Sequence, residues 1–231
     1  MSNNKLALIH LDEPWANRLS NLRVEAYSKH GGSLVNPTAL RWGMSDERYA
    51  NIAIIQGGEI LAALRFELHR TQETLAFSLQ QSVTPNVLPA ALTSRAATVW
   101  HFLNHGGHRY LRMIAIETAR TLGLSELYCT YIQNENRTRM LRAIGYMVEE
   151  SSANWSDFLQ TKEPIALARL DVQKHGESAA EKLRESLAAF AVSKNPETAP
   201  LLKLPWSGFV RELAQAIQIN PLNQKNQNPA N

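Results

Sequence analysis

The first periodic pattern in the chain lies between residues 13 and 30. Apolar side chains recur there every three or four residues, the spacing that puts them on one face of a helix. Two glycines follow at positions 31 and 32, where such a helix would end. The apolar positions are Trp15, Leu19, Leu22 and Ala26. We therefore predict an N-terminal helix over residues 13–30.

Strand patterns occupy the next part of the chain. The run YANIAIIQGGEILAALRFELH, residues 49–69, has two apolar halves around Gly57 and Gly58 and predicts an antiparallel hairpin. A loop with Pro85 and Pro89 follows. The run RAATVWHF, residues 95–102, is then short and apolar, which is typical of a buried strand.

Helical and extended patterns alternate up to residue 172. Residues 111–122 place apolar side chains on one helical face, and Gly123 closes that helix. The run ELYCTYIQ, residues 126–133, predicts a strand. Residues 134–148 predict a short helix that stops at Gly145 and a further strand, and residues 164–172 predict the last strand.

Beyond residue 172 the pattern is helical. Two stretches each carry one apolar face, and Pro205 suits the start of the second. The faces consist of Ala180, Leu183, Leu187 and Phe190, and of Trp206, Phe209, Val210, Leu213 and Ile217. Residues 220–231 have almost nothing apolar to bury, which predicts a disordered tail. The expected division is therefore a domain over 1–172, a helical extension over 173–219 and the tail over 220–231.

Composition narrows the class of protein. The chain has 231 residues, 44% of them hydrophobic and 19% charged, which is typical of a globular chain with one domain and an appendage. The formal charge of +3 favours an acidic ligand, while the lack of a basic block with aromatics argues against nucleic acid. No apolar run reaches the ~20 residues of a membrane span. A single cysteine and the lack of a secretory leader lead us to expect a cytoplasmic protein.

The stretch HGGHRYLRM, which begins at His105, combines a glycine pair with basic residues at the start of a helix. Free N–H groups at a helix N-terminus attract anions, and Gly106 and Gly107 would let a phosphate approach the backbone. Arg109 and Arg112 add positive charge. A plain turn is the alternative, since the stretch is neither a P-loop nor a dinucleotide-binding turn.

In this order, the predicted elements resemble the GNAT acyltransferase superfamily over residues 15–172. Asn134 matches the start of a helix in that family, and Gly145 with Tyr146 matches its end. The resemblance implies an α/β fold with a central mixed, mostly antiparallel sheet flanked by helices, here with a C-terminal helical extension. It also implies a donor thioester, either acyl-CoA or acyl carrier protein. The donor-binding residues so implied are Val99, Trp100, Gly106, Gly107, His108, Arg109, Arg112 and Asn134.

The N-terminal half resembles one branch of this superfamily, the acyl-homoserine-lactone synthases and N-acyl amino acid synthases. The matching runs are LRVEAYSKHGG, the acidic stretch with Asp46, Glu47 and Tyr49, GGEILAALRFELH and ALTSRAATV. They align Arg23, Tyr27, Arg65, Ser94 and Arg95 with the branch. The resemblance implies transfer of a fatty acyl group to the amino group of a small molecule, with Arg23, Tyr27 and Arg95 binding that acceptor.

Aminolysis of a thioester requires a neutral amine and an acceptor for its proton. Glu67 is our candidate base, because it lies two residues after Arg65 and so on the same strand face. His69 continues that face as the second candidate. The alternative for Glu67 is an exposed carboxylate paired with Arg65. The resemblance implies that backbone N–H groups of the AATVW strand hold the thioester oxygen, an interaction worth about 3 kcal/mol.

Several other patterns have plainer explanations. His101, His105 and His108 lack a completing ligand set, so no metal is expected. Cys129 is expected to be a small buried residue. A basic helix face with Arg137, Arg139 and Arg142 is either solvated or contacts an acidic carrier protein.

Two further alternatives stay open. The C-terminal helices cap the core, form a homodimer contact or roof an acyl tunnel. Leu141 is at the position where the family has a tyrosine, and Leu92 is at the position where the branch has an acidic residue. The alternative to an enzyme is therefore a non-catalytic GNAT-like binding module.

Overall fold

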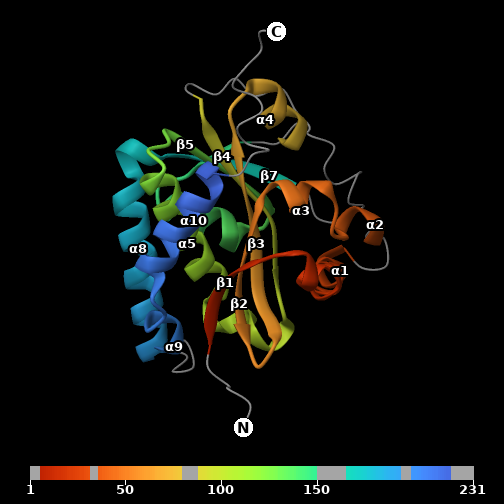
Figure 1. Ribbon diagram of the computed structural model, residues 1–231. Helices are drawn as coiled ribbons and strands as arrows, with labels where there is room; N and C mark the ends of the chain where they lie inside the picture. Colours follow the sequence, from red (N-terminus) through yellow and green to blue (C-terminus); the bar gives the residue numbers. More distant parts are fainter. Residues whose placement is uncertain (1–5, 32–35, 80–87, 150–164, 194–198, 220–231) are drawn as a thin grey trace, which may run out of the picture.

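The computed structural model describes residues 6–31, 36–79, 88–149, 165–193 and 199–219, which build a twisted seven-stranded sheet (Figure 1). The strand order is β1-β2-β3-β4-β5-β7-β6, and among these strands only β4 and β5 pair in parallel. The strands are β1 (Ala7–Leu11), β2 (Ala50–Gln56), β3 (Glu59–His69), β4 (Ala90–Thr98), β5 (Glu126–Ile132), β6 (Met147–Glu149) and β7 (Ile165–Asp171).

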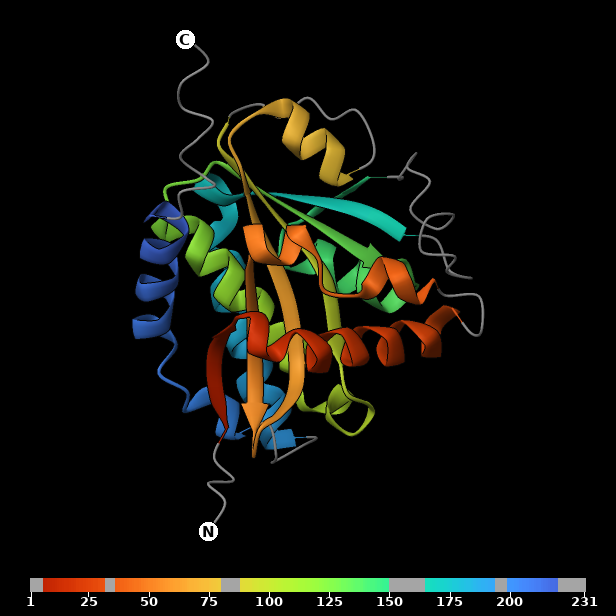
Figure 2. The ribbon, with the colours of Figure 1, turned by 45° about the vertical axis from the view of Figure 1, so that its right-hand side comes forward.

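Helices cover both faces of this sheet. The turned view shows α1 (Ala16–Gly31) crossing one face, with α2 (Pro37–Leu40) and α3 (Met44–Arg48) beside it (Figure 2). The opposite face carries α5 (Gly107–Thr121), α6 (Glu135–Ala143), α8 (Val172–Ser193) and α10 (Trp206–Ile219). Shorter helices are η1 (Glu13–Trp15), α4 (Gln72–Leu79), η3 (Trp100–His105) and α9 (Ala199–Leu202). The expected fold class is confirmed: a mixed, mostly antiparallel sheet flanked by helices, with helices at the C-terminal end.

Most of the predicted elements are present, and one is displaced. The N-terminal helix, the hairpin, the helix before Gly123 and the strands after it all lie where the pattern placed them. The strand predicted over residues 95–102 instead begins at Ala90 and ends at Thr98. β4 starts earlier because it pairs with β3 from His69 onward, and it ends where Val99 N–H bonds Leu61 O at 2.9 Å. The edge strand β1 and the short helices α2, α3, α4, η3 and α9 were not predicted.

A bulge lies in the middle of β4. Ser94 and Ala97 face Arg65 and Ala63, so three residue steps on β4 oppose two on β3. Arg95 within the bulge has a φ of 55°, in the left-handed region that non-glycine residues seldom occupy. Beyond this point β4 and β5 separate. Their pairing covers only residues 91–93 of β4 and residues 127–129 of β5.

The C-terminal helices belong to the same hydrophobic core as the sheet. α8 packs along α5, and α10 packs on both α5 and β1. Their buried side chains are Ala180, Leu183, Leu187, Val210, Leu213 and Ile217. Fully burying one large aliphatic side chain contributes about 1.5–3 kcal/mol, so this cover is a large share of the stability of the α5 face. Among the described helices, none is both long and apolar enough to cross a bilayer.

We predict that a chain ending at Val172 loses cooperative thermal unfolding, because the apolar face of α5 is then exposed to water. A chain ending at Ile219 is the matched control and should unfold like the full chain. Circular dichroism and size-exclusion chromatography measure both. A chain ending at Val172 that remains monomeric and unfolds cooperatively would contradict the prediction.

Candidate functional site

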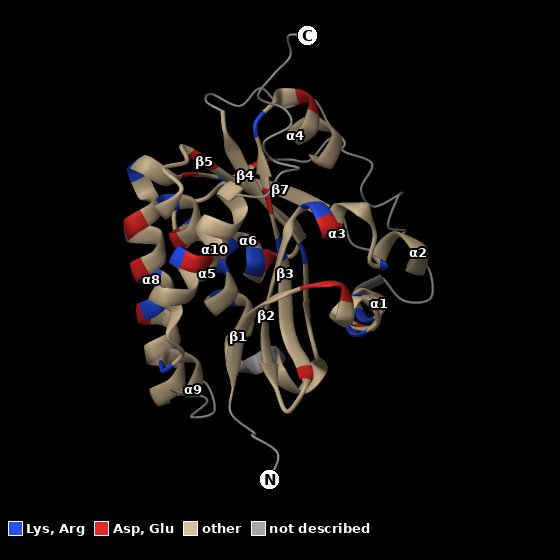
Figure 3. Ribbon diagram, in the orientation of Figure 1, with Lys and Arg blue, Asp and Glu red and all other residues tan. Residues whose placement is uncertain are grey.

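A cleft of about 350 Å³ opens where β4 and β5 separate. Its walls come from both faces of the sheet, with Tyr27 of α1 on one side and α5, α6 and Phe190 of α8 on the other. The positively charged side chains in its lining are Lys29, Arg109, Arg112 and Arg137. None of the described lining residues is Asp or Glu, and Figure 3 shows Lys and Arg colour on α6. This excess of positive charge indicates an anionic ligand.

The glycine pair at the start of α5 has two different surroundings. Gly106 lines the cleft with a φ of 79° and precedes the first turn of α5, whose N–H groups are the expected anion donors. Gly107 is buried, and a Cβ at its position would lie 2.8 Å from the Phe102 ring and 3.2 Å from the Ala62 Cβ. Packing therefore explains Gly107, whereas Gly106 has the position expected for phosphate binding.

Two predicted donor-binding side chains are held in the cleft by contacts from other elements. His108 Nε2 lies 2.7 Å from Thr98 Oγ1 on β4. Arg109 Nη1 donates to Ser186 Oγ at 3.0 Å, and its guanidinium lies 5.5 Å from the Phe190 ring. Helix α8 thus positions one of the cations of the cleft.

Three other predicted donor residues have different surroundings. Trp100 is 66% exposed at the rim, with Lys29 Nζ 5.2 Å from its ring. The Val99 N–H already bonds Leu61 O, so it is not free to hold a thioester oxygen. The Asn134 side chain caps α6 by accepting the Arg137 N–H at 2.9 Å, and Asn134 is not among the described lining residues.

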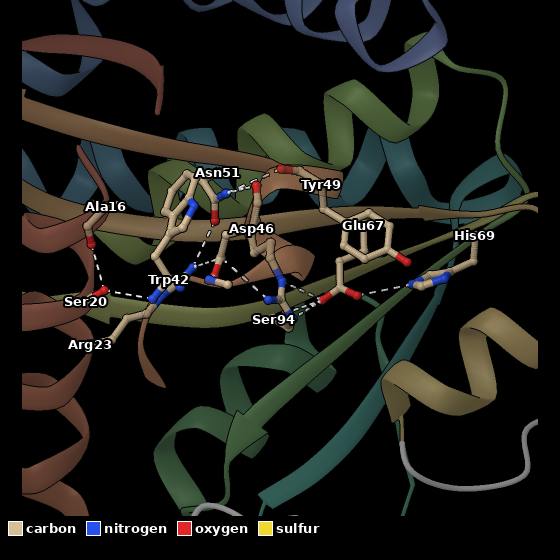
Figure 4. Close-up of polar contacts among 12 residues, drawn as sticks. Ala16, Ser20, Arg23, Trp42, Asp46, Tyr49, Asn51, Glu67, His69 and Ser94 are labelled. Carbon is tan, nitrogen blue, oxygen red and sulfur yellow. Dashed lines mark hydrogen bonds and ion pairs between the residues drawn. The ribbon is translucent and has the colours of Figure 1, made fainter. Parts of the chain in front are cut away.

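A buried polar network occupies the α1 face of the sheet and joins α1, α3, β2, β3 and β4 (Figure 4). Asp46 Oδ1 lies 2.8 Å from Arg23 Nη2 and 3.5 Å from Arg65 Nη1. Arg65 Nη2 lies 2.9 Å from Glu67 Oε1, which also accepts from the Ser94 hydroxyl. Arg65 and Glu67 therefore do share a face, as the strand period predicted.

Glu67 is fully buried rather than exposed. Burial alone would raise the pKa of Glu67, but Arg65, His69 and Ser94 hold it well below its ordinary value. His69 Nε2 lies 3.4 Å from Glu67 Oε2. A carboxylate with a lowered pKa is a weak proton acceptor, and Glu67 is not among the described residues that line the cleft. The base function stays a prediction, while these contacts favour Glu67 as a residue that positions its neighbours.

Arg95 and Tyr27 come together at the bulge. Both line a small cavity of about 10 Å³, which shares Tyr27, Thr130, Tyr131 and Ile132 with the cleft. Among the described residues Arg95 Nη1 is buried without a hydrogen-bond partner, and burial together with nearby Arg65 lowers the pKa of Arg95 to about 10. A cation without a partner at this point favours an anionic group in the neighbouring cleft.

Several lining residues were missed by the sequence analysis. They are Ala26, Lys29, Thr130, Tyr131, Ile132, Asn136, Met140 and Phe190. Phe190 was predicted only as part of a buried helical face, and nothing local in the sequence links it to β4. Within the described residues, no group of three His, Cys, Asp or Glu side chains could hold a metal ion. The side chain of His105 lies outside the described residues.

The C-terminal helices touch two different cavities. Phe190 of α8 lines the cleft, whereas Leu213, Ala216 and Ile217 of α10 line a separate cavity of about 280 Å³ beside β1 and α3. The apolar face that was predicted to roof an acyl tunnel belongs to α10, which does not line the cleft, so the tunnel stays a prediction.

No protein-family model and no curated protein matches this sequence. Solved structures match it in fold. The acyl-homoserine-lactone (AHL) synthase LasI has 13% identity and a TM-score of 0.53 over 78% of this chain and 96% of its own. FeeM, an N-acyl amino acid synthase from uncultured soil microbes, has 11% identity and a TM-score of 0.55 over 74% of this chain and 94% of its own.

The loading GNATL domain of CurA from Lyngbya majuscula is similar to the same extent. It has 13% identity and a TM-score of 0.53, and the match covers 74% of this chain and all of that domain, 100%. The chain therefore has the fold of the GNAT acyltransferases, and the resemblance stated from the sequence is confirmed at the level of fold.

The Glu67 network yields a prediction for stability against pH. Glu67→Gln removes one charge of a buried pair and should lower the free energy of unfolding at pH 7 by about 3–5 kcal/mol. Because the pKa of Glu67 is lowered in the folded state, this contribution is complete above the unfolded value of 4.5. It should shrink as the pH falls below that value toward the folded pKa, which urea unfolding at several pH values measures.

Glu25→Gln is the matched control for this measurement. Glu25 pairs with Lys29 at 2.7 Å on the surface of α1, where its side chain is 56% exposed. Its loss should change the free energy of unfolding by less than about 1 kcal/mol. Equal effects of the two substitutions would contradict the prediction.

Proposed function

We propose that this protein is an N-acyltransferase that moves an acyl group from a thioester donor to the amino group of a small molecule. The observation that carries the proposal is the cationic cleft between the separating strands β4 and β5, which joins the two faces of the sheet. Such a passage lets a donor and an acceptor meet from opposite faces. The enzymes named for similar folds, an AHL synthase and an N-acyl amino acid synthase, support the same class of reaction.

The donor would enter on the α5 face. Its phosphates would lie against Gly106 and the first turn of α5, where helix N–H groups and Arg109 supply positive charge, with Arg137 opposite. Acyl-CoA and an acyl carrier protein both carry a phosphopantetheine arm and fit this description. The exposed Arg139 and Arg142 on α6 are suited to an acidic carrier protein.

The thioester would lie at the bulge of β4. A bulge leaves its extra residue outside the ladder, so the backbone at Arg95 and Ala96 can present an N–H group to the cleft. Ala96 lines the cleft, whereas the Val99 N–H is engaged elsewhere. A preorganised N–H donor at this position would stabilise the developing oxyanion.

The acceptor would bind on the α1 face, beside Tyr27 and Arg95. Arg23 is 1% exposed and bonded to Asp46, so it would support this site by holding α1 against β2 rather than by touching the substrate. Glu67 would hold Arg65 and Ser94 beside the bulge. The amine nitrogen attacks the thioester carbon, the C–N bond forms as the C–S bond breaks, and the surplus amine proton leaves through water.

A non-catalytic binding module is the second candidate. It is favoured by the complete burial of Glu67, which leaves the cleft without that carboxylate as a base. The two candidates differ in turnover, because both bind an acyl thioester but only the enzyme releases its thiol.

We therefore predict thiol release when the protein is given acyl-CoA or an acyl carrier protein thioester together with a mixture of small amines. A thiol reagent follows release, and mass spectrometry identifies the amide. Arg95→Gln is expected to lower kcat/KM about 10- to 100-fold, chiefly through the KM of the acceptor, because a charge-assisted contact contributes about 1.5–3 kcal/mol. Tight donor binding without thiol release would favour the binding module.

A further prediction concerns donor binding. Arg109→Glu and Arg137→Glu should each weaken binding of CoA by at least about 10-fold, since each replaces a favourable charge in the cleft with an unfavourable one. The loss should diminish at high salt. Calorimetric titration measures it, with Arg211→Glu as the control because Arg211 is exposed on α10 outside the cleft lining. Equal affinities of all three variants would place the donor elsewhere.

A further inference from the structure

Arg112 is a cation at the wall of the cleft that has no carboxylate beside it. It lies in the second turn of α5, with its guanidinium 5.5 Å from the Tyr146 ring and near the Cys129 thiol. Its Nη1 atom is shielded from solvent and has no hydrogen-bond partner within the described part of the chain. Among the described residues, no Asp or Glu forms an ion pair with it.

Three other arginines of the interior are paired with carboxylates, whereas Arg95 shares with Arg112 a shielded Nη1 atom that has no partner among the described residues. Arg23 has Asp46 at 2.8 Å, Arg65 has Glu67 at 2.9 Å and Arg169 has Glu126 at 3.1 Å. A buried charge without a partner is costly, so folded chains usually neutralise it. Arg112 also lines the cleft, which is where a ligand could supply the missing negative charge.

The topology narrows the choice of anion. Under the proposed function, phosphates lie at the start of α5, the amine lies beside Arg95 on the α1 face, and the thioester lies in the gap between them. The sulfur joins the carbonyl carbon to the phosphopantetheine arm. It must therefore lie on the α5 side of that carbon, where Arg112 lines the cleft and contacts Cys129 and Tyr146.

We propose that Arg112 stabilises the thiolate that leaves during acyl transfer, a function that rests on the proposed activity. The amine nitrogen bonds to the carbonyl carbon, and the C–S bond breaks with its electron pair remaining on sulfur. The guanidinium balances that charge while remaining protonated. The thiolate then takes up, through water, the proton that the amine has released.

Tyr146 lies beside Arg112 but outside the described lining of the cleft. Burial raises the pKa of Tyr146, so its phenol stays protonated at neutral pH. The phenol contacts the guanidinium as a neutral group and so leaves the charge of Arg112 uncompensated. The missing negative charge therefore has to come from a ligand in the cleft.

The test varies the basicity of the leaving thiol. One acyl group is presented as thioesters of alkyl thiols and of the much more acidic aryl thiols, with hydroxylamine as a small common acceptor. Arg112→Gln should slow kcat/KM about 100-fold or more with alkyl thioesters, and less than about 5-fold with aryl thioesters, whose thiolates need little stabilisation. Arg112→Lys, which keeps the charge, should recover part of the loss. Arg109→Gln is the control and should affect both classes equally.

A second measurement does not depend on turnover. CoA and desulfo-CoA, which lacks the sulfur, are titrated calorimetrically in buffers of different ionisation enthalpy. If Arg112 faces the sulfur, wild-type protein should release a proton on binding CoA but not desulfo-CoA near pH 7.5, since a neighbouring cation lowers the pKa of a thiol. Arg112→Gln should abolish that release.

The outcomes separate the two proposals. Equal losses with alkyl and aryl thioesters, or proton release that is unchanged in Arg112→Gln, would overturn the function of Arg112 even if the protein is an acyltransferase. If the protein shows no turnover but its proton release depends on Arg112, the thiolate site is supported and the proposed enzymatic activity is overturned. Arg112→Met should also raise the melting temperature, and a lower one would indicate a structural function instead.

Discussion

The short parallel pairing of β4 with β5 is the constraint on which the rest of the molecule depends. Parallel neighbours cannot be joined by a tight turn, so the chain must cross over one face of the sheet, and α5 is that crossover. The crossover begins where β4 ends, which places the N-terminus of α5 at the edge where the two strands separate. The cleft, its helix N–H donors and its cations therefore come from one topological requirement, and α8 and α10 are needed because α5 is too apolar to remain uncovered.

Two buried charge systems lie on opposite faces of this sheet, and they differ in balance. On the α1 face, arginines and carboxylates neutralise one another except at Arg95. On the α5 face, none of the described residues that line the cleft with Arg112 is acidic. Cations without a paired carboxylate at a cleft lower the stability of the folded chain. Such a loss of stability is common at sites that are preorganised to bind a ligand. The balanced pairs stiffen the scaffold, and the unbalanced residues are those expected to touch ligands.

Sequence periodicity was sufficient to predict the secondary structure of a segment wherever that segment determines its own structure. The shared face of Arg65 and Glu67 follows from the strand period, and the hairpin and α5 follow from their apolar patterns and glycines. It could not show that Glu67 is buried, because Asp46 and Ser94 reach Arg65 and Glu67 from distant segments. The start of β4 depends on pairing with β3, the need for glycine at position 107 depends on Phe102 and Ala62, and the position of Arg109 depends on α8. Each of these is a long-range contact and leaves no local signal.

The C-terminal cover of α5 also determines when the domain can become complete during synthesis. The helix that lies under α8 and α10 is finished at Thr121, but the last residues that shield it are near Ile217. At about 5–20 residues per second, the ribosome needs roughly 5–20 s to make the intervening chain. Throughout that interval the growing polypeptide carries an uncovered apolar helix beside an unfinished sheet. The nascent chain is thus exposed to aggregation and to chaperone binding until its last helix emerges.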